Sequence, residues 1–213
     1  MNADDRAPDL ADQPGSPAEM DALLRAQQRS VVRQSARAVP AILAAWGIAW
    51  LVGFGLMWLA GASLPGLALT SIWVFVALNT SAVAASAIVS ARGSRGIRLS
   101  RESGTAAALY GVTWVVGILA IALFGWALAL AGMTDDVALL FYPIAWMLFV
   151  GIMHIVAGAV WRVAGPAVLG GWVVLVSLGA AFAGHPADLA VLALGAGGAF
   201  LAAAIVAAVW IRR

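Results

Sequence analysis

The side chains of this chain that could do chemistry inside a membrane are few, and they lie in long apolar runs. Asn79 lies in the second run, Tyr110 and Thr113 lie in the third, and His154 lies in the fourth. At a helical rise of 1.5 Å per residue, Asn79 falls near the middle of its run, and Thr113 and His154 fall about one turn nearer the arginine-bearing side. We take these four residues as candidates for one ligand pocket. The alternative is structural, since polar side chains in apolar helices also form hydrogen bonds to neighbouring helices or to their own backbone.

Catalytic groups are scarce in the sequence. Charged residues are absent from the interior of every apolar run, so coupling to protons or sodium through a buried carboxylate is not expected. There is no cysteine, and we find neither a serine nucleophile motif nor a glycine-rich phosphate loop. The two histidines, His154 and His185, fall at different depths and cannot ligate one metal or haem. We therefore expect no enzyme activity, no catalytic residues, no metal and no cofactor.

The arginines indicate how the chain crosses the membrane. All twelve basic residues are arginines, and residues 38–91, 102–161 and 163–211 contain none. Each of these stretches is long enough for two crossings of a hydrocarbon core about 30 Å thick. Because arginine accumulates on the cytoplasmic side, the pattern predicts six transmembrane helices in three hairpins with both termini cytoplasmic.

Composition agrees with this class. The chain is 63% hydrophobic and only 10% charged, with a mean hydropathy of +0.97. A soluble domain would need about a quarter of its residues charged, so the composition predicts an integral membrane protein. The net charge of +2 is explained by topology, and no nucleic-acid binding is expected.

The predicted architecture is an all-α membrane protein with short outer connections and no external domain. Its six-helix transmembrane domain covers residues 39–213. The expected spans are Pro40–Ala60, Leu67–Ala91, Ala106–Leu130, Ala138–Trp161, Ala167–Ala183 and Leu189–Trp210.

Two segments precede the first span. Residues 1–15 are acidic and rich in alanine and proline, a composition that predicts disorder. Ser16, Pro17 and Glu19 match a helix capping box, so we expect a juxtamembrane helix over residues 16–38. On a helical wheel its apolar side chains gather on one side, and the opposite side carries Arg25, Arg29, Arg33 and Arg37. We expect no cleavable signal peptide before it.

A second arginine group lies between the second and third spans and comprises Arg92, Arg95, Arg98 and Arg101. Together with the juxtamembrane helix it forms a basic inner face. The simplest partner is a bilayer with anionic headgroups, and an acidic cytoplasmic protein is the alternative. The spacing of three also occurs in voltage-sensing helices, but glycines and serines intervene and the spans offer no acidic countercharge.

A weak internal repeat accompanies the hairpins. The stretch from Gly47 to Gly53 recurs from Gly111 to Gly117, and more faintly from Gly171. A duplicated hairpin and a coincidence of composition both explain it equally well.

Ala26-Gln27-Gln28-Arg29 together with the run from Gly47 to Gly55 resembles a group of uncharacterised actinobacterial six-span membrane proteins. The similarity extends from about Ala22 to the C-terminus. It implies a bacterial plasma membrane and a transporter-type description, and it supplies no functional residues.

We expect a small, non-enzymatic, multi-pass bacterial membrane protein of transporter or permease-accessory type, acting as a homo-oligomer or with a partner subunit. The alternative is a membrane-embedded sensor or regulatory anchor, which docks a cytoplasmic partner through its arginine-rich inner face.

Overall fold

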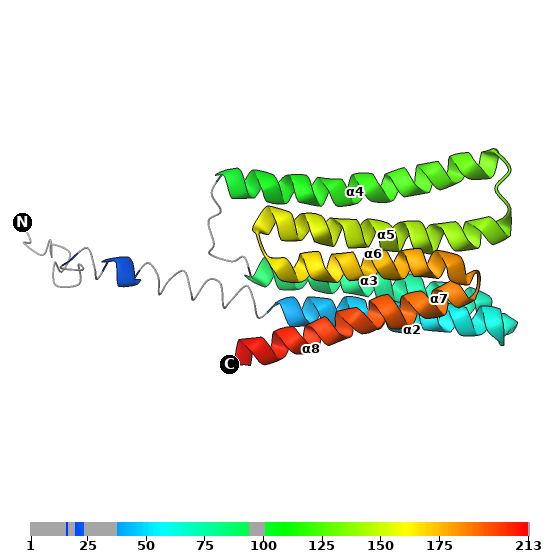
Figure 1. Ribbon diagram of the computed structural model, residues 1–213, viewed down its shortest axis with the longest axis horizontal. Helices are drawn as coiled ribbons and strands as arrows, with labels where there is room; N and C mark the ends of the chain where they lie inside the picture. The colour runs from blue at the N-terminus through cyan, green and yellow to red at the C-terminus, as the bar shows by residue number, and fades with distance from the viewer. Residues whose placement is uncertain (1–15, 17–19, 24–37, 94–100, 213) are drawn as a thin grey trace, which may run out of the picture.

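The computed structural model describes Ser16 and residues 20–23, 38–93 and 101–212, and helices dominate throughout these ranges (Figure 1). The described residues form six helices that are long and apolar enough to cross a membrane, and they contain no strand. The predicted class of a six-span, all-helical integral membrane protein is therefore confirmed.

The first five spans are each one continuous helix. The sixth is divided into α7, a π-helical turn η3, and α8. The bounds are α2 (Val39–Ala62), α3 (Ala68–Gly93), α4 (Arg101–Leu130), α5 (Asp135–Trp161), α6 (Ala164–Ala183), α7 (Ala187–Val191), η3 (Leu192–Gly197) and α8 (Gly198–Arg212), with a short 3-10 turn η2 (Pro65–Leu67) before α3.

Most of the helices begin earlier than hydropathy predicted, and two of them, α4 and α5, begin with polar residues. Helix α4 starts at Arg101 instead of Ala106, and the hydroxyl of Thr105 donates to the Arg101 carbonyl within this polar first turn. Helix α5 starts at Asp135 instead of Ala138, and two aspartates lie in its first turn. Acidic side chains are favoured there because the N-terminus of a helix carries partial positive charge. Hydropathy marks where a helix enters the apolar core, not where its backbone becomes helical.

The described arginines gather at one end of the bundle. Arg92, Arg101 and Arg162 lie at helix termini on the same side as the start of α2 and the end of α8 (Figure 1). We call this the arginine end. The connections after α2, α4 and α6 lie at the opposite end, which we call the far end. Three hairpins that share one arginine side are therefore present, and the cytoplasmic location of that side stays a prediction.

Parts of the predicted inner face lie outside the described residues. These are residues 1–15, most of the juxtamembrane helix 16–38 with Arg25, Arg29, Arg33 and Arg37, and the loop residues Arg95 and Arg98. Within the juxtamembrane segment, residues 20–23 are helical, and the Met20 amide donates to the Ser16 carbonyl at 3.1 Å.

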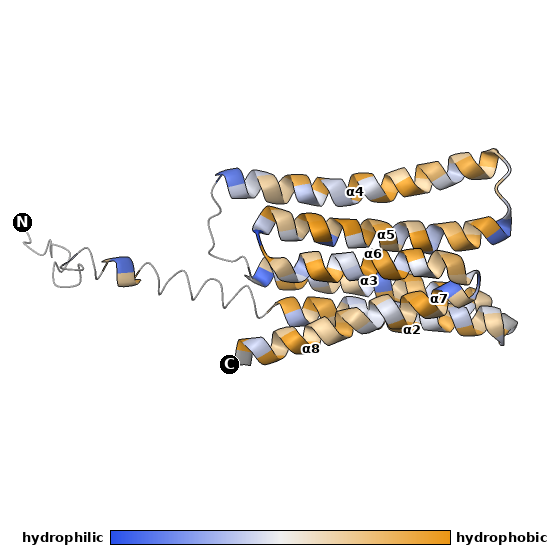
Figure 2. Ribbon diagram, in the orientation of Figure 1, coloured by the Kyte–Doolittle hydropathy of each residue, from blue (hydrophilic) through white to orange (hydrophobic). Residues whose placement is uncertain are grey.

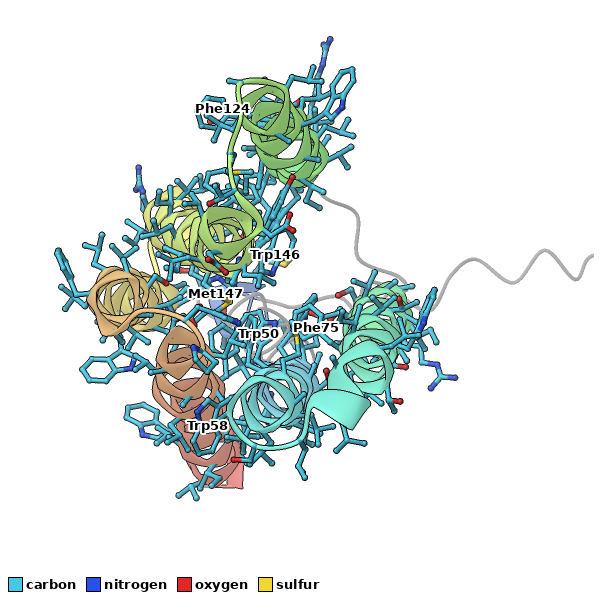
Figure 3. All side chains as sticks on the ribbon, turned by 90° about the vertical axis from the view of Figure 1, so that its right-hand side faces the viewer. Trp50, Trp58, Phe75, Phe124, Trp146 and Met147 are labelled. Atoms are coloured by element: carbon cyan, nitrogen blue, oxygen red, sulfur yellow. The ribbon has the colours of Figure 1, made fainter. Side chains whose placement is uncertain are left out.

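The six spans form an arc that is open between α4 and α3 (Figure 3). Around the arc, α4 packs on α5, α5 on α6, α6 on the sixth span, the sixth span on α2, and α2 on α3. The two most extensive associations join α5 to α6 and α2 to the sixth span, and each of them joins helices of different predicted hairpins. The second hairpin, α4 with α5, is looser, so sequence neighbours are not in every case the tightest pair.

Glycine permits the close approach of α5 and α6. A Cβ atom at Gly170 would lie 2.7 Å from the Ile155 amide nitrogen and would also collide with the Gly151 carbonyl oxygen. A Cβ atom at Gly158 would lie 2.6 Å from the Cβ of Ala167. The two backbones are therefore in direct contact, which is how helices associate when lipid is as apolar as their side chains.

The core lies where α2, α5, α6 and the sixth span meet. Trp50 and Met147 face each other across it (Figure 3), with Phe200 and Leu192 also fully buried. Figure 2 shows apolar residues along the whole length of all six spans and hydrophilic residues chiefly at their ends. The outward side chains are thus as apolar as the core, as expected for helices that contact lipid.

Gly170→Ala should destabilise the protein by about 1–3 kcal/mol, because the added methyl group forces α5 and α6 apart. Gly171→Ala is the matched control, since a Cβ atom there meets nothing within 4 Å. The control should be neutral, or more stable by up to about 1 kcal/mol from improved helix propensity. Reversible unfolding in mixed micelles with sodium dodecyl sulfate measures both, and equal effects would refute the packing argument.

Candidate functional site

Asn79 joins α3 to α2. Its side-chain oxygen accepts a hydrogen bond from the indole N–H of Trp50 at 3.3 Å, and its amide nitrogen donates to the Phe75 carbonyl at 2.8 Å. A second indole bond lies about one turn away along α2 and about two turns away along α3, from Trp46 to the hydroxyl of Ser86 at 3.0 Å. Both tryptophans belong to α2 and both acceptors to α3, so these bonds fix the register of the two helices.

His154 lies among aromatic rings. Its Nδ1 is 2.8 Å from the Val150 carbonyl oxygen of the preceding turn, which makes Nδ1 the protonated nitrogen in the neutral ring. The imidazole packs edge-on against Phe200 of α8, at 5.1 Å between centroids, and against Trp114 of α4, at 6.4 Å. It therefore contacts helices on both sides of α5.

Tyr110 and Thr113 take different roles although both lie on α4. The Tyr110 hydroxyl donates to the Met153 carbonyl of α5 at 3.3 Å, and its ring packs edge-on against Trp161. Thr113 is exposed, and its hydroxyl donates to its own helix at the Leu109 carbonyl, 2.9 Å away. Tyr110 thus connects α4 to α5, whereas the hydroxyl of Thr113 bonds only within α4.

One aromatic cluster connects three of the four candidates. It runs from α2 through α8 and α5 to α4, with successive ring centroids 4.6–6.4 Å apart. His154 and Tyr110 are members, and Asn79 is attached through the Trp50 indole. The members are Trp46, Trp50, Phe200, His154, Trp114, Phe149, Trp146, Tyr110 and Trp161.

Each of the four candidates makes at least one hydrogen bond to protein atoms, and aromatic rings lie between Asn79, His154 and Tyr110. Such a cluster can contact an apolar or aromatic molecule by packing, and it presents no nucleophile paired with a base. Among the described residues, no group of three or more histidine, cysteine, aspartate or glutamate side chains could hold a metal ion.

The tryptophans of the weak repeat occupy unlike surroundings. Trp50 is fully buried and bonded to Asn79, Trp114 is partly buried among rings, and Trp172 is half-exposed, with its indole N–H bonded to the Gly195 carbonyl at 2.9 Å. That carbonyl belongs to the π-helical turn, where the regular backbone ladder changes register. The three positions thus share a residue type without sharing an environment.

A groove of about 310 Å³ lies on the outer surface between α2 and the start of the sixth span. Its lining is apolar and contains none of the four candidates. Trp58 of α2, which forms part of the wall, lies on the outside of the arc (Figure 3), and α7 and η3 form the opposite wall. The lining residues are Leu51, Val52, Gly55, Leu56, Trp58, Leu59, Ala190, Ala193 and Leu194.

Sequence reasoning missed Asp188. It placed residues 184–188 in an outer connection, whereas Asp188 is helical, lies in α7 and is fully buried. Its Oδ1 is 3.1 Å from Nδ1 of His185. The available signal was the spacing of three between a histidine and an aspartate, which places both on one side of a helical turn.

In comparisons with known proteins, no family model matches this chain, and no match was found among curated proteins or solved structures.

A double-mutant cycle of Trp50→Phe and Asn79→Leu should give a coupling energy of about 0.6 kcal/mol, the average for interhelical hydrogen bonds in membranes, and no more than about 1.7 kcal/mol. Trp50→Phe keeps an aromatic ring and removes the N–H donor. Trp126→Phe, at an exposed position of α4, is the control and should show no coupling to Asn79→Leu. Unfolding in mixed micelles measures each corner of the cycle, and zero coupling for Trp50 would contradict the proposed bond.

Proposed function

We propose that this chain is a non-enzymatic, multi-pass protein of a bacterial plasma membrane, of transporter or permease-accessory type. It works as one part of a larger membrane assembly, either with copies of itself or with a partner subunit. The open arc is the observation that carries this proposal.

The two helices at the opening, α3 and α4, are far less covered than the rest. Only 6% of the membrane-crossing window of each is buried, against 28–39% for the other four spans. Each packs mainly on one neighbour, α3 on α2 and α4 on α5. A transporter that functions as a monomer would be expected to surround the route of its solute with helices. The open edges at α3 and α4 therefore support assembly with further transmembrane helices.

The proposed substrate is uncharged and largely apolar. Trp146 and Phe75 lie on the inner side of the arc (Figure 3), and the aromatic cluster continues from there. Along the described spans, charged side chains occur only near the ends, so a charged solute would meet no countercharge at mid-depth. Packing against aromatic rings suits an apolar solute.

The test combines a deletion strain with purified protein. The deletion should change uptake or efflux of an uncharged apolar compound in a broad substrate screen, and that compound should stabilise the protein in liposomes. Trp146→Ala should weaken this stabilisation about tenfold, equivalent to 1.4 kcal/mol. Trp126→Ala, on the exposed side of α4, should leave it unchanged. The proposal fails if neither a transport phenotype nor a stabilising compound is found.

A second function, a regulatory anchor, is favoured by the arginine end. Arg92, Arg101 and Arg162 are all exposed there. Such a surface suits an acidic cytoplasmic protein as well as anionic headgroups. Photo-crosslinking from this end should capture one protein, and Arg92→Gln with Arg101→Gln should abolish the capture. Recovery of lipid alone would count against the anchor and would leave the transport proposal standing.

A further inference from the structure

A fully buried carboxylate lies at the far end of the bundle, and within the described part of the chain a single titratable side chain contacts it. The Asp188 side chain retains 0% of its accessible surface. Its Oδ1 contacts His185, and its Oδ2 has no hydrogen-bond partner in the described structure. Burying an ionised carboxylate without compensation costs several kcal/mol, so the arrangement requires a positive group or a proton.

His185 is the group that can supply it. Helix α7 packs against α6, α2 and η3, and none of these three elements contains a charged or titratable residue. The other acids at this end, Asp135 and Asp136, begin α5 and are exposed. His185 retains 25% of its side-chain surface, so its ring reaches the aqueous side while its Nδ1 faces the carboxylate. Imidazole is the side chain that ordinarily changes charge between about pH 5 and 8.

We propose that His185 and Asp188 form a proton-binding site at the far end of the bundle, and that the bound proton holds the start of the sixth span against the first. With the proton bound, the imidazolium neutralises the buried carboxylate. Without the proton, the buried carboxylate is an uncompensated charge, and its free energy falls when it becomes hydrated. This inference goes beyond the proposed function and does not depend on it.

Contacts of the turn that carries His185 and Pro186 couple proton binding to the packing of α7 on α2. A Cβ atom at Gly61, near the end of α2, would lie 3.1 Å from the Cβ of Pro186 and 3.8 Å from Nε2 of His185. The turn that carries the histidine therefore rests directly on α2. Exposing Asp188 to water requires α7 to leave this contact. Leu59 and Ala190, which flank the outer groove, would separate with it.

The first experiment observes the proton directly in the whole protein. The chain has only two histidines, so 15N-histidine labelling yields two sets of ring signals, and a His154→Gln variant identifies them. The His185 ring should change from imidazolium to neutral imidazole as the pH is raised. Asp188→Asn removes the negative charge that favours the imidazolium, so the His185 ring should not titrate alike in the two proteins. A His185 ring that stays neutral throughout, or that titrates identically in both proteins, overturns the proposal.

The second experiment measures the consequence for stability. The proposal requires the folded state to bind this proton more tightly than the unfolded chain does, so the stabilisation is present at low pH and is lost as the pH rises. The melting temperature of the wild type should therefore fall as the pH rises through the transition that the first experiment records, and that slope should be reduced in Asp188→Asn. Asp135→Asn, a matched change at an exposed acid of the same end, should keep the wild-type slope. Equal slopes in all three proteins overturn the proposal.

A distance measurement requires no change at the site. The chain has no native cysteine, so spin labels at Leu64→Cys and Ala187→Cys report the separation of the α2 and α7 ends. Both positions are exposed. The distance distribution should shift to longer values as the pH rises through the His185 transition. A distribution that is independent of pH overturns the coupling to helix packing even if the proton is bound.

Discussion

The direct backbone contact between α5 and α6 is the constraint on which the rest of this structure depends. In a bilayer, an apolar side chain gains little by leaving lipid for protein, so helices hold together where their surfaces approach most closely. Gly151, Gly158 and Gly170 allow that approach. On the sixth span, a Cβ atom at Gly197 would lie 2.6 Å from the Leu51 amide nitrogen, so glycine sets the distance to α2 as well. A continuous series of close contacts thus runs from α5 to α2.

Hydrogen bonds attach the two edge helices, α3 and α4, to the closely packed part of the bundle. Trp46 and Trp50 donate from α2 to acceptors on α3, and Tyr110 donates from α4 to the backbone of α5. These bonds attach the two edge helices, which have less buried surface than the rest. Two of the four polar residues that first suggested a pocket, Asn79 and Tyr110, are therefore also residues that hold the edges of the arc. A ligand that enters at the aromatic cluster would meet surfaces whose positions these bonds determine.

Hydropathy and arginine spacing predicted the six spans to within a few residues, because both are local properties of each segment. Helix–helix partners could not be predicted in the same way. Gly151 and Gly170 look like many other glycines of this chain, and only the fold shows that they face each other. Asp188 is the sharpest miss. A carboxylate five residues after the end of α6 suggests a solvated loop, and its burial follows from α2, α6 and η3 closing around it.

By itself, the sequence determined the membrane class, the number of spans, and the location of the described arginines at one end of the bundle. Each of these follows from the cost of placing charge or unpaired backbone in hydrocarbon, which acts on every residue separately. Only the tertiary structure decided the order of helices around the arc, the exposed edges at α3 and α4, and the pairing of His185 with Asp188. Those depend on which surfaces meet, and in this chain most surfaces carry the same small and aliphatic residues. Such a uniform composition strongly favours insertion of every span in the membrane. It determines which helices pair only at the few positions where a glycine, a tryptophan or a buried charge makes a specific contact.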